Sequence, residues 1–128
     1  MDCSAILKLG ETVSKEYIVE ETDSANHLGN EGITVLSTPA MIKYMELTAA
    51  GIVFERVSKK YRPVGTRINI KHINPAPVGE KITVEAVVNR IDGPKVTFDV
   101  KVLNKESSVG YGECTFHVVG LDKFRSRF

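Results

Sequence analysis

Residues 38–54 read TPAMIKYMELTAAGIVF, and this apolar stretch decides the fold. The spacing of its apolar residues predicts one helix that extends to about Lys60. Thr38 is a suitable N-cap, and Pro39 fits the first helical position because its missing N–H would be unpaired there. Since the helix is apolar on nearly every side, it needs cover from other elements all round.

Alternating sequences predict a sheet that supplies this cover. Pro63 and Gly65 indicate that the helix has ended, and one strand is expected before it and four after it. Asp92-Gly93, between two of these strands, is a strong hairpin signal. Period-2 alternation gives each strand one buried and one solvated face. The expected strands are residues 15–20, 67–73, 81–91, 96–102 and 109–119.

The order of strand, long helix and antiparallel meander predicts an α+β protein in which a curved sheet of about five strands wraps a central helix. This is the hotdog fold, and residues 1–128 are expected to form one such domain. Gly110 and Gly112 share the buried face of the last strand. The backbone of that strand is therefore expected to approach the helix closely.

Composition narrows the range of functions. The formal net charge is +1 without long runs of either sign, which disfavours nucleic acid or an anionic membrane as the main partner. No apolar run reaches the roughly 18 residues of a transmembrane helix, and no signal-peptide pattern opens the chain, so a cytoplasmic location is expected. Cys3 and Cys114 lack metal-ligand spacing and are expected to be free thiols. Neither a metal nor a cofactor is expected.

Glu46 is the residue that most strongly suggests a function. On a helical wheel it lies between Ile42, Ala49 and Val53, in the middle of an apolar stripe. A carboxylate placed there loses water, and burying an unpaired charge is costly. Two interpretations follow from the residues. Glu46 is either a catalytic carboxylate at the floor of a cleft, or a structural residue that pairs with a buried Arg or caps a loop amide.

His72 is the second unusual placement. It shares a strand face with Ile68 and Ile70, which is expected to be the core face. Lone inward histidines are common as hydrogen-bonded core residues. A neutral imidazole close to Glu46 would instead relay protons or hold the carboxylate in place.

Hydroxyl groups at the start of the helix form a third group of candidates. The hydroxyl of Thr38 is explained by capping, yet a cap hydroxyl can project into a cleft, and Ser37 could serve in its place. His27 lies in a polar loop and is interpreted as a surface or lid residue.

Several short motifs follow one another along the chain. They are Leu9-Gly10-Glu11, His27-Leu28, Val64-Gly65-Thr66, Pro75-Ala76-Pro77-Val78-Gly79, Asp92-Gly93, Val109-Gly110-Tyr111-Gly112 and Asp122-Lys123-Phe124. In this order and spacing, with a Thr eight residues before a helical Glu and a His on the next strand, the chain resembles the fluoroacetyl-CoA thioesterase-like family of hotdog proteins. The resemblance covers nearly the whole chain.

The resemblance implies hydrolysis of acyl-CoA thioesters by a Thr, a Glu and a His, which correspond to Thr38, Glu46 and His72. It leaves open whether Glu46 is a nucleophile that forms a mixed anhydride or a general base towards water. A backbone amide at Gly65 is implied to polarise the thioester carbonyl. The candidate substrate-binding residues are Gly65, Ser37 and Phe116.

Two departures from the family pattern concern substrate selectivity. The loop between His27-Leu28 and the helix is several residues shorter and lacks a Phe-bearing lid segment. Phe116 stands where the prototype of the family has an Arg. The reaction is therefore carried over without the fluoroacetyl substrate, and hydrolysis of a short-chain acyl-CoA is expected.

Two other functions compete with the thioesterase. One is a non-catalytic module that binds or senses acyl-CoA on the same fold. The other is a hotdog hydratase, whose pattern resembles an Asp five residues before a His. Arg67 occupies that position relative to His72, so the hydratase ranks last.

The expected partners are an acyl-CoA substrate and a second copy of the chain. One sheet around one helix leaves strand edges and apolar surface uncovered, which favours a homodimer or a tetramer. Hotdog proteins resemble one another in joining two sheets edge to edge, with active sites near the interface.

Overall fold

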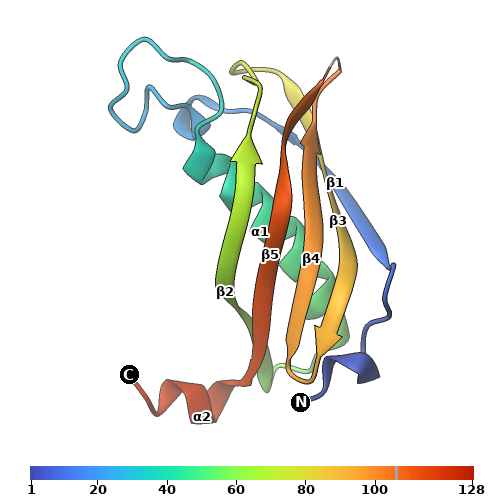
Figure 1. Ribbon diagram of the computed structural model, residues 1–128. Helices are drawn as coiled ribbons and strands as arrows, with labels where there is room; N and C mark the ends of the chain where they lie inside the picture. The colour runs from blue at the N-terminus through green and yellow to red at the C-terminus, as the bar shows by residue number, and fades with distance from the viewer. Residues whose placement is uncertain (106) are drawn as a thin grey trace.

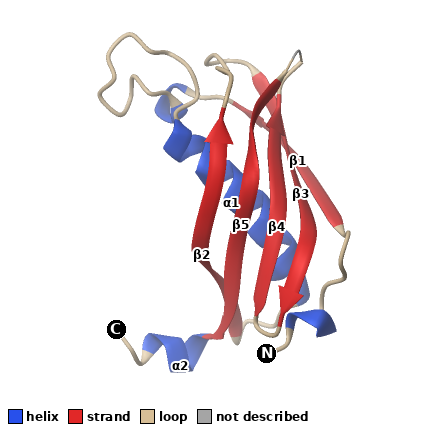
Figure 2. Cartoon of the chain, in the orientation of Figure 1, coloured by secondary structure: helices blue, strands red, loops and turns tan. Residues whose placement is uncertain are grey.

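The computed structural model describes residues 1–105 and 107–128. One long helix, α1 (Thr38–Arg56), crosses one face of a five-stranded antiparallel sheet (Figure 1). The sheet is made of β1 (Thr12–Ile18), β2 (Tyr61–His72), β3 (Lys81–Asp92), β4 (Lys95–Leu103) and β5 (Ser108–Gly120), in the spatial order β1-β3-β4-β5-β2. The described chain also contains three short helical segments, at Cys3–Ala5, Glu21–Asp23 and α2 (Leu121–Arg125) (Figure 2).

The core lies between α1 and the inner face of the sheet. Along α1 a stripe of fully buried residues recurs every four positions, at Met41, Met45, Ala49 and Val53. The inward positions of the two central strands alternate as the sequence predicts. They are Ile82, Val84, Ala86 and Val88 in β3, and Val96, Phe98, Val100 and Val102 in β4, each 3% exposed or less.

The two glycines of β5 have different neighbours. A Cβ atom added at Gly110 would lie 2.5 Å from Sδ of Met41, so the predicted close approach of strand and helix is confirmed there. A Cβ at Gly112 would instead collide with the backbone of Ile70 on β2. Gly112 therefore allows close packing between strands, and it shares the inner face with Gly110, as predicted, because it pairs with the inward residue Val100.

The end of α1 and the start of β2 differ from the prediction. α1 ends at Arg56 instead of Lys60, because Val57 is already extended (φ −98°, ψ 153°). β2 begins at Tyr61 and therefore contains both Pro63 and Gly65. Proline is tolerated because β2 is an edge strand, where one missing backbone donor breaks no ladder on the open side.

The first strand was also misplaced, since β1 begins at Thr12 and ends at Ile18, not at residue 20. It pairs with β3 only, and its residues are mostly exposed, so the sequence alternation that marks a buried face is weak. The predicted hairpin is confirmed, because Asp92 pairs with Lys95 across a turn in which Gly93 has φ +59°.

Candidate active site

The first turn of α1 frees the hydroxyl of Thr38. The N-cap is Ser37, whose Oγ accepts a hydrogen bond from the backbone N–H of Ala40 at 3.2 Å. The prediction that Thr38 caps the helix was therefore wrong by one residue. Serine and threonine cap equally well in principle, and Pro39 is still harmless one position further on because N–H groups of the whole first turn lack helical partners.

Thr38 instead contacts His72. Its Oγ1 lies 2.8 Å from Nδ1 of the imidazole, at the point where the start of α1 meets the end of β2. In the tautomer that carries its proton on Nε2, Nδ1 accepts the hydroxyl hydrogen. The sequence predicted each residue separately, and the structure brings them together.

His72 is half-buried on the same strand face as Ile68 and Ile70, as predicted. Burial lowers the pKa of its imidazole below the ordinary value of 6.5, and a backbone hydrogen bond with Asn74 partly opposes that shift. The neutral form therefore predominates at pH 7. A neutral imidazole can both accept and donate a proton, which is the property that proton relay requires.

Glu46 lies about two turns further along α1 than Thr38, beside Gly65 of β2. A Cβ atom at Gly65 would collide with Oε2 of Glu46, so the absence of a side chain there lets the carboxylate lie directly against the backbone of β2. Burial, with the charge of Glu46 as a second cause, raises the pKa of the Cys114 thiol to about 12. Within the described part of the chain Glu46 forms neither an ion pair nor a hydrogen bond, so the structural interpretation with a paired Arg or a capped amide finds no support there.

Phe116 forms an apolar wall near this carboxylate. It is 3% exposed and packs edge-on against Phe98 with ring centroids 6.0 Å apart. Its Cε1 would lie 3.9 Å from a Cβ atom at Gly65. Two of the three candidate substrate-binding residues, Gly65 and Phe116, thus surround Glu46, whereas the third, Ser37, is buried and its hydroxyl is occupied as the helix cap.

A buried network before α1 was missed by the sequence analysis. Asp23 is 2% exposed, and its carboxylate accepts hydrogen bonds from the hydroxyl of Tyr44 at 2.5 Å and from Nζ of Lys43 at 3.1 Å. Its backbone carbonyl accepts the N–H of Ser37 at 2.8 Å. Asp23 therefore fixes the entry to the helix and, through it, the position of Thr38.

The ionisation of this network is well defined. Burial alone would raise the pKa of Asp23, but hydrogen bonds from Tyr44, the N–H of Glu20 and Lys43 together hold it below its usual range. Burial and the neighbouring carboxylate raise the pKa of Tyr44. The only sequence signal was an acidic residue shortly before the helix, and its partners on α1 are some twenty positions away.

The loop between Asp23 and the helix is closed on itself. Backbone hydrogen bonds join Ala25 to Val35 at 2.9 Å and Asn26 to Ile33 at 2.8 Å. His27 is exposed, and its ring makes no hydrogen bond within residues 1–105 and 107–128. The structure therefore leaves His27 outside the contacts that join Thr38 and His72.

The candidate residues form two groups along α1. Thr38 and Glu46 are eight residues apart, which is roughly 12 Å of helix. The hydroxyl–imidazole pair and the carboxylate thus lie at separate points along the boundary between α1 and β2. Among the described residues no cluster of three or more His, Cys, Asp or Glu side chains could hold a metal ion, and the absence of a cofactor stays a prediction.

A long helix covered by one antiparallel sheet in this strand order defines a hotdog protein. The family model described as fluoroacetyl-CoA-specific thioesterase matches residues 19–121. The chain therefore belongs to this family. The predicted family and the predicted enzyme class, an acyl-CoA thioesterase, are both confirmed.

Similar proteins agree with this assignment. The fluoroacetyl-CoA thioesterase of Streptantibioticus cattleyicolor is 22% identical over 127 residues, which cover 94% of this chain and 91% of that protein. A variant of the fluoroacetyl-CoA thioesterase, solved in complex with acetyl-CoA, aligns with a TM-score of 0.89 at 21% identity over 94% of this chain and 96% of its own. A hot-dog-like protein from Thermanaerovibrio acidaminovorans aligns with a TM-score of 0.91 at 23% identity, over 99% and 94%. These similarities confirm the hotdog fold.

Proposed function

We propose that this chain hydrolyses short-chain acyl-CoA thioesters to the free acid and CoA, with Thr38, Glu46 and His72 as its catalytic residues. The contact of 2.8 Å between Thr38 and His72 carries the proposal, because it joins two of the three residues across elements that are distant in sequence. Membership of the thioesterase family supports the reaction type. The complex of a related enzyme with acetyl-CoA supports a short acyl group.

The chemistry assigns each group a role. Hydrolysis breaks the C–S bond of the thioester and forms a C–O bond to the oxygen of water. One proton leaves the water, and the departing CoA thiolate takes up a proton. His72, neutral at pH 7 and hydrogen-bonded to Thr38, delivers the proton that the thiolate takes up. The carbonyl oxygen gains negative charge during attack, and the backbone N–H of Gly65 is the proposed donor to it.

Glu46 promotes attack on the acyl carbon in one of two ways. As a general base it removes the proton of the attacking water. As a nucleophile it forms a mixed anhydride, which water then hydrolyses. Because Gly65 carries no side chain, the carboxylate lies directly against the backbone of β2, beside the residue whose N–H is the proposed donor to the carbonyl oxygen. Phe116 supplies an apolar wall for the acyl group.

Release of free CoA thiol tests the proposal. The full chain is incubated with acetyl-, propionyl- and butyryl-CoA, and the thiol is measured over time. Turnover above the uncatalysed rate with at least one substrate is expected. Binding of these thioesters without release of thiol would favour the non-catalytic acyl-CoA module instead.

The proposed assembly is a homodimer joined at a strand edge. β1 and β2 are the two edge strands of the sheet. On α1, Leu47 is 56% and Phe54 51% exposed, so the helix is covered incompletely in a single chain. Edge pairing would satisfy the open strand, and a neighbouring copy would cover the apolar helix surface.

A cytoplasmic location is proposed with the acyl-CoA substrate. Among the described helices, none is long and apolar enough to cross a membrane.

A further inference from the structure

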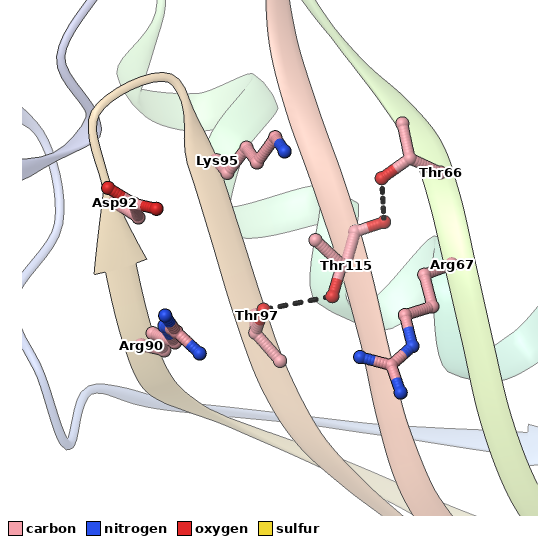
Figure 3. A pocket seen from close by; sticks show the side chains of 7 residues that line it. All are labelled: Thr66, Arg67, Arg90, Asp92, Lys95, Thr97 and Thr115. Carbon is pink, nitrogen blue, oxygen red and sulfur yellow. Dashed lines mark hydrogen bonds between the residues drawn. The ribbon is translucent and has the colours of Figure 1, made fainter.

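A hollow of about 390 Å³ lies on the outer face of the sheet, opposite the face that packs on α1. Figure 3 shows the seven residues that line it. Its lining includes three cationic side chains, those of Arg67, Arg90 and Lys95, and one carboxylate, Asp92. The balance of charge in this hollow is therefore positive, although the chain as a whole is nearly neutral.

Strand register explains why these residues meet. Arg90 on β3 pairs with Thr97 on β4, Thr97 pairs with Thr115 on β5, and Thr115 pairs with Arg67 on β2. Arg90, Thr97, Thr115 and Arg67 thus form one row across four neighbouring strands. Lys95 lies two residues before Thr97 on the same face of β4. We call Arg67, Arg90 and Lys95 with the two threonines between them the outer cationic cluster.

The cations of this cluster have no partners of their own. Within residues 1–105 and 107–128, the side chains of Arg67, Arg90 and Lys95 form neither an ion pair nor a hydrogen bond. Two other cations of the sheet are paired: Lys101 lies 3.0 Å from Glu85, and Lys81 lies 2.6 Å from Glu16. Three unpaired cations gathered around a hollow repel one another, and an anionic ligand would relieve that repulsion.

The threonines provide a donor between the cations. The hydroxyls of Thr97 and Thr115 lie 2.9 Å apart, so one hydrogen joins them and the other is available to a ligand. The hydroxyl of Thr66 is already directed to the backbone carbonyl of Thr115 at 3.3 Å (Figure 3). A hydroxyl donor flanked by two guanidinium groups matches the oxygen-rich, multiply charged surface of a phosphate group.

We propose that the outer cationic cluster binds a phosphate-bearing small molecule. Arginine forks bind phosphate oxygens in pairs, and Lys95 adds a point charge at one end of the row. The site lies on the sheet face opposite α1, so it is distinct from the catalytic residues and does not rest on the proposed function. Edge-to-edge pairing of two sheets uses backbone groups and leaves this face open.

Titration of the ¹⁵N-labelled full chain with inorganic pyrophosphate, followed by amide NMR, tests the proposal. Amide shifts centred on Thr97 and Thr115 are expected. Arg67→Gln and Arg90→Gln should each weaken pyrophosphate binding by about tenfold or more, because each removes charge-assisted hydrogen bonds. Lys71→Gln, which removes an exposed charge from the same face of β2, is the matched control and should change the affinity less than about twofold.

A second titration with CoA identifies the source of the phosphate. Shifts at the same amides, lost in both arginine variants, would support the site with the phosphates of CoA as its ligand. Shifts with pyrophosphate alone would support a site for a separate phosphate compound.

Three results would overturn the proposal. The first is that pyrophosphate does not shift the amide signals of Thr97 and Thr115. The second is that Lys71→Gln weakens binding as much as the arginine variants do. In the third case, light scattering would show that the arginine variants change the oligomeric mass, so that the cluster contacts another copy of the chain. Because pyrophosphate contains no thioester, none of these results depends on the thioesterase activity.

Discussion

Glu46 combines partial burial with the absence of a partner among the described residues. Its charge contributes to the raised pKa of the buried Cys114 thiol, so the carboxylate lies close to the apolar interior. An incompletely solvated, unpaired carboxylate is costly for a fold. The proposed role as base or nucleophile gives this arrangement a use, and Gly65 makes it sterically possible because a side chain there would collide with the carboxylate.

Replacement of Glu46 by Gln should remove most activity and leave the fold intact. The amide has nearly the same shape but can act neither as base nor as nucleophile, so kcat is expected to fall by about 10²-fold or more. The measurement is CoA release together with the thermal midpoint. Glu55→Gln, on the exposed side of the same helix, is the control and should retain wild-type turnover. A Glu46→Gln enzyme that turned over at the wild-type rate would make Glu46 structural.

His72 should set an acidic limb in the pH–rate profile. Burial lowers the pKa of the imidazole below 6.5, so activity that requires the neutral form is full near pH 7 and declines only at more acidic pH. His72→Ala should lower the rate and remove this limb. Rates are measured from pH 5 to pH 8 for both proteins. If the variant kept the wild-type profile, His72 would belong to the core and not to the catalytic machinery.

At the scale of the elements, the entry to α1 depends on Asp23. This carboxylate lies in the loop before the helix and joins two consecutive residues of the second helical turn, Lys43 and Tyr44. The backbone of Asp23 holds Ser37, and Ser37 caps the helix. The position of Thr38 against His72 therefore relies on a residue that has no direct part in the proposed chemistry.

Replacement of Asp23 by Asn should destabilise the chain by about 1–3 kcal/mol at pH 7, since hydrogen bonds from Tyr44, Lys43 and Glu20 lose their charged acceptor. The folded-state pKa of Asp23 lies below its unfolded value, so its contribution is present above about pH 4 and is lost as the pH falls through the folded pKa. Urea unfolding at pH 7 and near pH 3 measures the effect.

The difference between wild type and Asp23→Asn should shrink at the lower pH. Glu31→Gln in the exposed part of the same loop is the control, and should change stability by less than about 0.5 kcal/mol. An equal loss of stability at both pH values would contradict a role for the ionised carboxylate.

Elements were predictable from sequence to the extent that they are buried on one face. β3 and β4 match the prediction closely because their inward positions are apolar and most of their outward positions are polar. The edge strands β1 and β2 carry weak alternation, and Pro63 and Gly65 predict the end of a helix although an edge strand accepts both.

The site residues also divide into those that the sequence could predict and those that it could not. Glu46 and His72 were recognised because each is polar on an apolar face. The bond between Thr38 and His72, the Asp23 network and the outer cationic cluster were not, because each depends on contacts between elements. The row from Arg90 to Arg67 in particular exists only through the register of four strands.

At the scale of the whole molecule, a single chain leaves apolar helix surface uncovered. We expect light scattering at micromolar concentration to give at least twice the mass of the chain. Leu47→Glu places a charge on the exposed apolar side of α1, and should weaken the dimer by about tenfold or more. Leu9→Glu, at a position that is 67% exposed in the N-terminal segment, is the control. A monomeric mass for the wild type would contradict the dimer.

The short loop before α1 and the apolar side chain of Phe116 together determine the expected substrate selectivity. The loop is folded back on itself through Gly29 and Gly32, whose φ angles of +102° and +86° favour glycine, so it forms a compact turn with little length to close over an acyl group. Phe116 presents an apolar ring, and one changed contact in an apolar pocket alters discrimination by only about 1–3 kcal/mol.

We therefore expect broad acceptance of short acyl chains and no strong preference for a fluorinated acetyl group. The measurement compares kcat/KM for acetyl-, fluoroacetyl- and butyryl-CoA under one set of conditions. Ratios within about 10–200-fold agree with a single apolar contact. A preference for fluoroacetyl-CoA over acetyl-CoA above about a thousandfold would exceed what one such contact supplies. Selectivity for fluorine would then arise without a long lid and without a cation at position 116, from polar groups nearer to Thr38 and His72.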